Sequence, residues 1–311
     1  MAADGWYTYT GREGEIIPRN ATRVRIDESL TVIPAWAFYG NRNIEEVECH
    51  DRVKTVGEEA FSNCTSLRLI IMSGVKVVEC EAFSCCYALA YVECDKLEII
   101  RHHAFLDCES LTSINLPSAK IIKEDAFLDC HALTNVVFGK ELESIKECAF
   151  FRCTSLERIT IPLKDNMITD DDIFEGCNLL HVDLVEGELH ESIDALLWEE
   201  WKNDMNEEIN SINQILPTTP AGAGDAVVDM GGKALAIRMW IRSVLRKIIQ
   251  YKAQHFSVLE EAAARLKLAL PQDIVIKNVI PFLELPSFTF EVGDHEDEED
   301  DSEEEEEESS Y

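Results

Sequence analysis

The sequence predicts an α+β protein: a repeat solenoid with a parallel β-sheet, followed by a C-terminal helical region and a disordered acidic tail. Three observations indicate this fold. The pattern A-F-x-x-C-x-x-L recurs along the first 185 residues. A helical pattern of apolar residues replaces it after Val185. The last stretch, 291–311, holds fourteen Asp or Glu and no Lys or Arg.

The repeat has a nearly constant step. Clear copies begin at Ala60, Ala82, Ala104, Ala126 and Ala149, and weaker copies at Ala37 and Ile173. The phenylalanines of these copies are Phe38, Phe61, Phe83, Phe105, Phe127, Phe150 and Phe174. One unit of this size cannot bury its own apolar face, whereas stacked units share a continuous core. The first part of the chain is therefore predicted to be a solenoid.

Each unit carries two further apolar segments. After the Cys comes Leu-x-x-Ile-x-Leu, as in Leu111, Ile114 and Leu116, and its alternation predicts a short strand with one buried face. Ile or Val also stands five residues before most of the phenylalanines. These positions are Ile33, Val56, Val78, Ile100, Ile122 and Ile145.

Over residues 21–185 this pattern resembles the BspA-like leucine-rich repeat. The resemblance implies that each repeat adds a strand to one long parallel sheet, and that the Phe and Cys side chains point inward in columns. Buried free cysteine behaves as a small apolar residue. The resemblance assigns this role to Cys64, Cys86, Cys108, Cys130, Cys153 and Cys177.

The regions outside the repeats divide the chain further. Residues 1–29 are predicted to cap the solenoid of residues 30–186, with Trp6, Tyr7 and Tyr9 available to cover the first coil. Residues 187–290 are predicted to be helical, with a linker near 217–232. One apolar stripe, with Ser192 as a candidate N-cap, predicts the first helix. The stripe consists of Ile193, Leu197, Trp201, Met205, Ile209, Ile212 and Leu216.

A second helix is predicted from about Lys233 to Leu268, with a break near Gln254. Its apolar side includes Trp240, Val244, Leu245, Ile248, Phe256, Leu259 and Leu266. Arg238, Arg242 and Arg246 are four residues apart and share another face. This basic helix face is either solvated or neutralised within the chain, or it docks an acidic partner or a phosphate.

Residues 270–288 resemble the opening of an F-box, a segment that docks a ubiquitin-ligase adaptor, although they follow the repeats instead of preceding them. The alternative is an amphipathic helix that completes the cap. The acidic tail cannot bury apolar surface and is predicted to be disordered. Such a tail keeps a protein soluble or contacts basic proteins, as in an acidic chaperone.

No catalytic, metal or cofactor site is predicted. The segment around Lys233 fails the phosphate-loop pattern, because Val227 replaces its first Gly and Ala234 its Ser or Thr. There is no C-x-x-C pair, and His102, His103 and His131 fall at loop positions of the coils. We therefore expect a protein that is not an enzyme and takes no small-molecule substrate.

The formal net charge of −32 bears on partners. Such a surface repels nucleic-acid phosphates, and no polybasic segment suits an anionic membrane. We expect a protein partner, basic if it is charged. The chain opens without an apolar signal region, and its eleven cysteines are an odd number, so we expect an intracellular, reducing location, cytoplasmic or nuclear.

Side chains between the buried strand positions point outward and form the candidate partner-binding surface. Leu69, Ile71 and Tyr91 are expected to form an exposed apolar group on adjacent strands. The surface also includes Glu46, Glu48, Glu93, Asp95 and Arg158. The leading prediction is a protein-interaction module that binds through this face of the solenoid.

Overall fold

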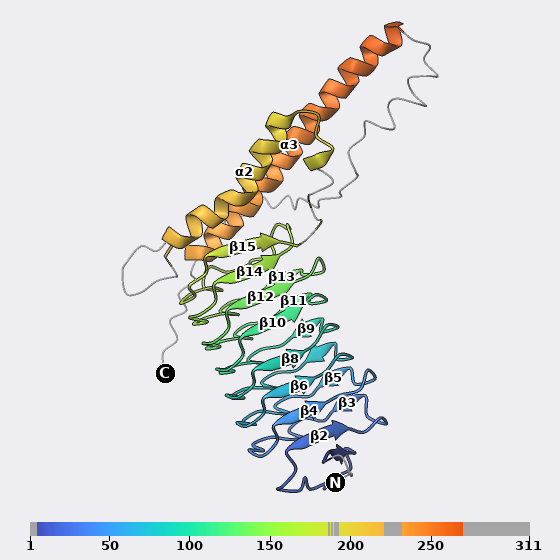
Figure 1. Ribbon diagram of the computed structural model, residues 1–311, viewed down its shortest axis with the longest axis vertical. Helices are drawn as coiled ribbons and strands as arrows, with labels where there is room; N and C mark the ends of the chain where they lie inside the picture. The colour runs from blue at the N-terminus through green and yellow to red at the C-terminus, as the bar shows by residue number, and fades with distance from the viewer. Residues whose placement is uncertain (1–4, 186, 188, 190–192, 221–231, 270–311) are drawn as a thin grey trace, which may run out of the picture.

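The computed structural model describes residues 5–185, 187, 189, 193–220 and 232–269. It is a parallel β-solenoid with two helices that project from its C-terminal end (Figure 1). We name each coil after its phenylalanine, from the Phe38 coil to the Phe174 coil. The F-box-like segment at 270–288 and the acidic tail at 291–311, both predicted from the sequence, lie outside the described residues.

The predicted strands form one face of the solenoid, in two hydrogen-bonded runs. The first run contains β1 (Tyr7–Tyr9), β2 (Arg23–Ile26), β4 (Glu46–Glu48), β6 (Leu69–Ile71) and β8 (Tyr91–Glu93). The second contains β10 (Ser113–Leu116), β12 (Asn135–Phe138), β14 (Arg158–Ile161) and β15 (His181–Leu184). All neighbours pair in parallel, with equivalent residues of successive coils opposite each other, as in Val47 opposite Ile70. We call this surface the strand face.

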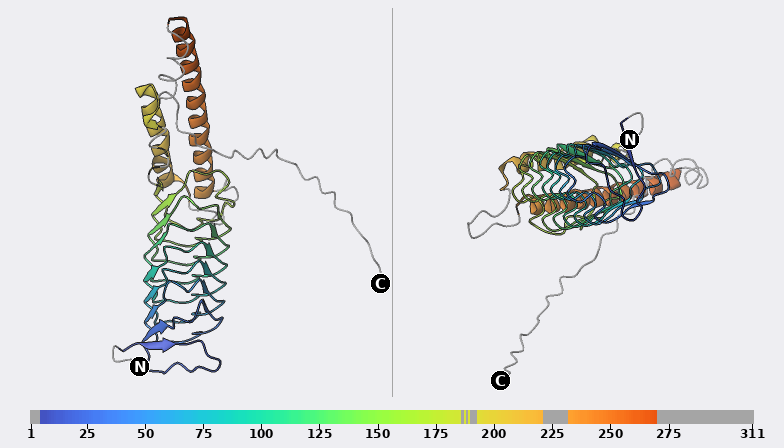
Figure 2. Two further views of the ribbon diagram at one scale, coloured as in Figure 1. Left: turned by 90° about the vertical axis from the view of Figure 1, so that its right-hand side faces the viewer. Right: turned by 90° about the horizontal axis from the view of Figure 1, so that it is seen from below.

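A second parallel sheet lines another side of the coil (Figure 2). It contains the two-residue strands β3 (Val32–Ile33), β5 (Thr55–Val56), β7 (Val77–Val78), β9 (Ile99–Ile100), β11 (Ile121–Ile122) and β13 (Ser144–Ile145). These strands hold the Ile and Val positions that precede each phenylalanine. The coils from Phe38 to Phe150 therefore contribute two strands each, where the family resemblance implied one.

The phenylalanines form a continuous stack through the core, as expected. From Phe38 to Phe150, successive rings are nearly parallel, with centroids 4.7–5.2 Å apart. This spacing matches the distance between neighbouring strands of a sheet, so one coil adds one ring. At the N-terminal end, Tyr9 is buried and its ring lies 4.7 Å from that of Phe38. Tyr9 therefore covers the first ring of the phenylalanine stack.

The cysteine column is buried, and it also joins successive coils. Each column thiol donates its S–H to the carbonyl oxygen of the phenylalanine in the preceding coil, at 3.0–3.3 Å. For example, Cys108 donates to Phe83. Burial raises the pKa of Cys64 to about 12, which keeps this thiol protonated. Cysteine recurs here because it is a small apolar residue that still carries a donor.

Backbone hydrogen bonds on either side of the phenylalanine link each coil to the next. The residues two before and two after it have left-handed backbones, for instance His103 (φ 53°) and Asp107 (φ 56°) in the Phe105 coil. Their N–H groups donate to the following coil: His103 to Glu124 at 3.4 Å and Asp107 to Leu128 at 3.0 Å. These bonds offset the unfavourable left-handed conformation of residues other than glycine.

The C-terminal helices are α2 (Glu199–Ile215), which continues into the short 3-10 helix η1 (Leu216–Thr218), and α3 (Gly232–Ala269). They are antiparallel, since Trp201 packs on Tyr251 whereas Leu216 accepts from Lys233. Ile193 and Asp194 are helical, but the predicted first helix is not continuous from there: residues 195–198 interrupt it, α2 begins at Glu199, and Leu197 is 45% exposed. The expected N-cap, Ser192, lies outside the described residues.

The predicted break of the second helix near Gln254 is also wrong, because α3 is continuous over 38 residues. Its apolar side is buried at Trp240, Val244, Leu245 and Ile248, whereas Phe256 is 42% exposed. The buried side of α3 continues at His255, one position before Phe256, so the Phe256 side chain lies on a more exposed side of the helix. The side chain of Leu266 lies outside the described part of the chain.

Both helices contact the last coil of the solenoid. Asn213 Oδ1 accepts from the Val182 N–H of β15 at 2.8 Å. The Lys233 ammonium is buried and donates to the carbonyl oxygens of Leu179, in the Phe174 coil, and Leu216. Burial lowers the pKa of Lys233. The buried charge is compatible with the fold because the ammonium donates to two carbonyl oxygens.

Candidate interaction surfaces

The strand face brings together most of the predicted partner-binding residues. Leu69 on β6 lies opposite Tyr91 on β8, and Ile71 lies opposite Glu93. Leu69 and Ile71 are half-buried, whereas Tyr91 is 52% exposed. The expected apolar group therefore exists, with Tyr91 as its most exposed member.

Charged groups border this apolar group on the N-terminal side. Arg23 pairs with Glu46 at 2.9 Å, and Arg25 pairs with Glu48 at 2.9 Å. The guanidinium groups also lie over the Trp6 ring, 5.7 and 4.9 Å from its centroid. Neighbouring arginines thus neutralise Glu46 and Glu48, a pairing that was not predicted from the sequence.

On the other side of the group, Glu93 accepts a hydrogen bond from Ser73 Oγ at 2.6 Å, and Asp95 is exposed just after β8. A neutral hydroxyl leaves the negative charge of Glu93 in place. Arg158 lies apart from this cluster, on β14, and pairs with Asp183 of β15. The structure thus assembles seven of the eight predicted residues on neighbouring strands β4, β6 and β8 or directly after them, and it separates the eighth.

The basic helix face is largely neutralised within the chain. This agrees with one of the two interpretations of its sequence. Arg238 pairs with Asp171 and donates to the Thr169 carbonyl oxygen at 3.2 Å. Arg242 pairs with Asp165 at 3.1 Å. These acids belong to the loop that lengthens the last repeat step to 24 residues, so this loop positions α3 on the solenoid. Arg246 is exposed.

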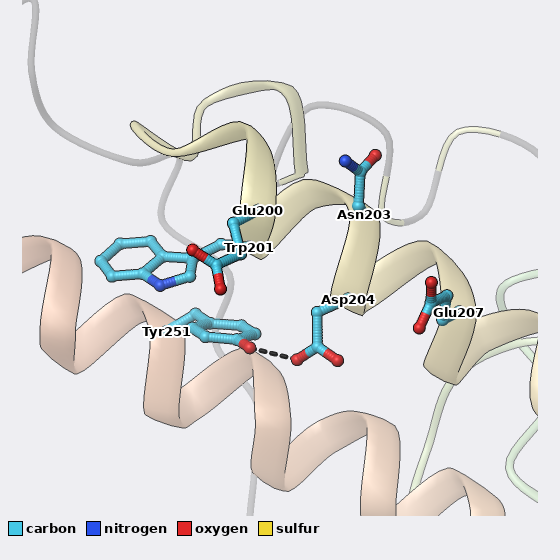
Figure 3. Close-up of a pocket in the computed structure, with 6 residues that line it drawn as sticks. All are labelled: Glu200, Trp201, Asn203, Asp204, Glu207 and Tyr251. Carbon is cyan, nitrogen blue, oxygen red and sulfur yellow. Dashed lines mark hydrogen bonds between the residues drawn. The ribbon is translucent and has the colours of Figure 1, made fainter.

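A shallow pocket lies between α2 and α3 (Figure 3). Trp201 and Tyr251 stack with centroids 5.3 Å apart, and the Tyr251 hydroxyl donates to Asp204. Lys247 also pairs with Asp204, at 3.0 Å, and with Glu208, at 3.0 Å. Lys247 is therefore the cation that neutralises these carboxylates, and its ion pairs join α2 to α3. This pocket is a weaker candidate than the strand face for binding a partner's basic side chain.

The ionisable groups between the helices are shifted toward their charged forms. The hydrogen bond from Tyr251, followed by that from Lys247, lowers the pKa of Asp204. The hydrogen bond from Ser243 lowers the pKa of Glu208 despite its partial burial, and Lys247 adds to this effect. Burial acts to lower the pKa of Lys247, but the hydrogen bonds to Asp204 and Glu208 outweigh it and raise that pKa.

The geometry defines a helix-capped repeat solenoid with an exposed strand face. Comparison with known families identifies its type: the model for the BspA type leucine rich repeat region matches in six copies, over residues 18–120 and 76–190. These matches cover more than half of the chain, which therefore belongs to this family. Repeats of this kind form solenoids that generally bind other proteins and are not generally enzymes.

Several solved structures are similar. A leucine rich cell surface protein from Faecalibacterium prausnitzii is 28% identical over 59% of this chain and 52% of its own, with a TM-score of 0.46. The T. pallidum leucine rich repeat protein is 24% identical over 57% and 83%, with a TM-score of 0.38. The pneumococcal vaccine antigen PcpA is 16% identical over 58% and 65%, with a TM-score of 0.34. The chain thus spans about half the length of the Faecalibacterium protein.

Because the three TM-scores are below 0.5, no conclusion about function is drawn from these similarities. Among curated proteins, no relative matches the chain. Within the described residues, no helix is long and apolar enough to cross a membrane.

Proposed function

We propose that this chain is a protein-interaction module and that its partner docks on the strand face around Tyr91. One observation carries the proposal: a tyrosine that is 52% exposed stands beside two half-buried aliphatic side chains on a regular sheet. Tyrosine is enriched among the residues that dominate binding energies, because its ring buries a large area with few rotatable bonds. A rigid sheet also needs little reorganisation on binding.

The charge around this group selects the partner. Arg23 and Arg25 neutralise the carboxylates on the β4 side, whereas Glu93 and Asp95 keep the β8 side acidic. The chain as a whole carries −32. The best fit is a protein surface with an apolar centre and basic residues along one border. Its association should weaken as salt rises, since exposed charges are screened beyond about 8 Å at physiological ionic strength.

The test compares two tyrosines of equal exposure. Tyr91 is 52% exposed on the strand face, and Tyr39 is 53% exposed elsewhere on the Phe38 coil. A partner recovered with the full chain is purified and titrated against wild type, Tyr91→Ala and Tyr39→Ala. Both substitutions remove the same exposed ring, so differences in folding or in nonspecific stickiness should be small.

We expect Tyr91→Ala to weaken binding at least about 10-fold, which corresponds to about 1.4 kcal/mol, and Tyr39→Ala to leave it unchanged. Equal losses at both positions would contradict a site at Tyr91. So would a partner whose affinity depends only on residues after 232.

Two other roles remain predictions. A ubiquitin-ligase adaptor would use residues 270–288, and an acidic chaperone would use the tail, and both segments lie outside the described residues. We also propose an intracellular location. It is supported by the column thiols, which are buried and donate S–H hydrogen bonds, and therefore act in their reduced form.

A further inference from the structure

One edge of the solenoid is rich in side chains that bind metal ions. The edge follows β5, β7, β9 and β11 and consists of the two residues that lie three and two positions before each phenylalanine (Figure 1). From Glu58–Glu59 in the Phe61 coil to Asp171–Asp172 in the Phe174 coil, these pairs read EE, CE, HH, ED, EC and DD. Every position thus carries Cys, His, Asp or Glu, although these residue types make up about a quarter of the chain.

The backbone sets these side chains at the spacing of neighbouring coils. In the first four pairs the second residue donates its N–H to the first residue of the next pair, for example His103 to Glu124 at 3.4 Å and Asp125 to Glu147 at 3.2 Å. His103 and Asp125 both have left-handed backbones, with φ of 53° and 55°. Equivalent side chains therefore point from the same edge, one coil apart.

Among the described residues, two groups of three place their ligand atoms within 4.8 Å of one another. The first consists of His102, His103 and Asp125. The Asp125 carboxylate lies 3.8 Å from His102 Nδ1 and 3.6 Å from His103 Nε2, and the two imidazole rings are 3.7 Å apart. All three side chains are half-buried, so solvent reaches the group while the coils hold it.

These distances are close to those of a tetrahedral zinc site. With bonds of about 2.0–2.1 Å, two ligands of one zinc ion lie about 3.3 Å apart. Small side-chain rotations would close the gap. His102 Nδ1 also lies 3.0 Å from the Glu124 carbonyl oxygen, so a metal at this nitrogen would replace that hydrogen bond. Two imidazoles and a carboxylate favour zinc, copper or nickel over magnesium or calcium.

The second group, Glu147, Cys148 and Asp172, is a poorer site. The Cys148 thiol donates to the Asp172 carboxylate at 3.4 Å. Burial, together with this hydrogen bond, raises the pKa of Cys148 to about 12, whereas the thiolate is the metal ligand. The neighbouring coil therefore serves as an internal comparison for the histidine group.

We propose that His102, His103 and Asp125 bind one divalent transition-metal ion of the zinc class, linking the Phe105 and Phe127 coils, with water completing the coordination. The site lies at the carboxyl ends of β9 and β11, away from the strand face (Figure 2). Metal binding and partner binding are therefore separable properties of the chain.

The test titrates Zn²⁺ into the full chain by calorimetry, in excess Mg²⁺ to occupy the acidic tail and other carboxylates. Co²⁺ serves as a second probe, because tetrahedral coordination gives it visible absorption. The variant is His102→Gln with His103→Asn: glutamine keeps a donor for the Glu124 carbonyl, and asparagine tolerates the left-handed backbone. His131→Asn and Cys148→Ala are the controls, and circular dichroism checks that each variant folds.

We expect one Zn²⁺ per chain, an apparent Kd raised more than about 10-fold in the double-histidine variant, and unchanged binding in both controls. Asp125→Asn should also weaken binding. The proposal is overturned if the folded double-histidine variant binds Zn²⁺ as wild type does, if binding depends on Cys148 or His131 instead, or if excess Mg²⁺ abolishes it.

Discussion

Replacing Cys108 shows whether the cysteine column acts through packing alone or through its S–H hydrogen bonds as well. Cys108 is fully buried, and its thiol donates to the Phe83 carbonyl oxygen at 3.3 Å. That oxygen also accepts from the Cys86 N–H at 3.2 Å, so it keeps one donor if the thiol is removed. The two explanations predict different orders for the alanine and serine variants.

The effect of Cys108→Ala can be estimated from three contributions. Loss of buried apolar surface costs about 0.8 kcal/mol, as for a methylene group. A cavity of about 20 Å³ costs about 0.5 kcal/mol. The lost hydrogen bond of a weak donor costs about 0.5 kcal/mol. We therefore expect the free energy of unfolding to fall by about 2 kcal/mol. The Cys108→Ser hydroxyl can still donate to Phe83, so serine should be no more destabilising than alanine.

The assay is urea unfolding followed by circular dichroism, with Cys80→Ala as the control. Cys80 is half-buried and outside the column, so its replacement should change stability by less than about 0.5 kcal/mol. If the column acted through packing alone, burying the serine hydroxyl would cost free energy, and the serine variant would be clearly less stable than the alanine variant. A serine variant that is less stable than alanine by more than about 1 kcal/mol would refute the hydrogen-bond explanation.

Three further predictions concern the C-terminal helices. Lys233→Met removes the donor to Leu179 and Leu216, so the packing of α3 on the last coil should become less stable by about 1–3 kcal/mol. Hydrogen exchange in α3 should then be faster; exchange as slow as in wild type would contradict this prediction. Swapping the charges of Arg242 and Asp165 should cost less than about 1 kcal/mol for each single change, and the double swap should restore stability in a double-mutant cycle. Because the pKa values of Asp204 and Glu208 are lowered in the folded state, their stabilisation is full above their ordinary values, near 4, and is lost as the pH falls through the lowered values. Acid should therefore separate α2 from α3, which the fluorescence of Trp201 on Tyr251 would report; a signal unchanged down to pH 2 would contradict this.

The repeat step was enough to predict the solenoid, and the family resemblance implied the inward phenylalanine and cysteine columns, because each depends on residue type at a fixed step. The second sheet was not predicted, since two residues such as Ile99–Ile100 are too short for alternation to show. The start of α2 was misplaced because the apolar spacing continues from Ile193 to Leu197, although residues 195–198 are not helical.

The candidate surface was predictable for similar reasons. Alternation along the strands places Leu69, Ile71 and Tyr91 outward, and the equal step brings them together. The pairing of Arg23 with Glu46 follows the same register and could have been found by aligning the strands. In contrast, the docking of Arg238 and Arg242 on the last coil joins residues about 70 positions apart. Nothing in the local pattern specifies which acids an exposed arginine will meet.

Photo-crosslinking from the strand face is the most direct test of a partner site at Tyr91. A benzoylphenylalanine placed at residue 91 would replace a ring that already points into solvent, and the same residue at position 39 provides a control of equal exposure. We expect a discrete crosslinked product from position 91 that unlabelled wild-type protein competes away, and none from position 39. Products of equal yield from both positions, or from 39 alone, would contradict a partner site on the strand face.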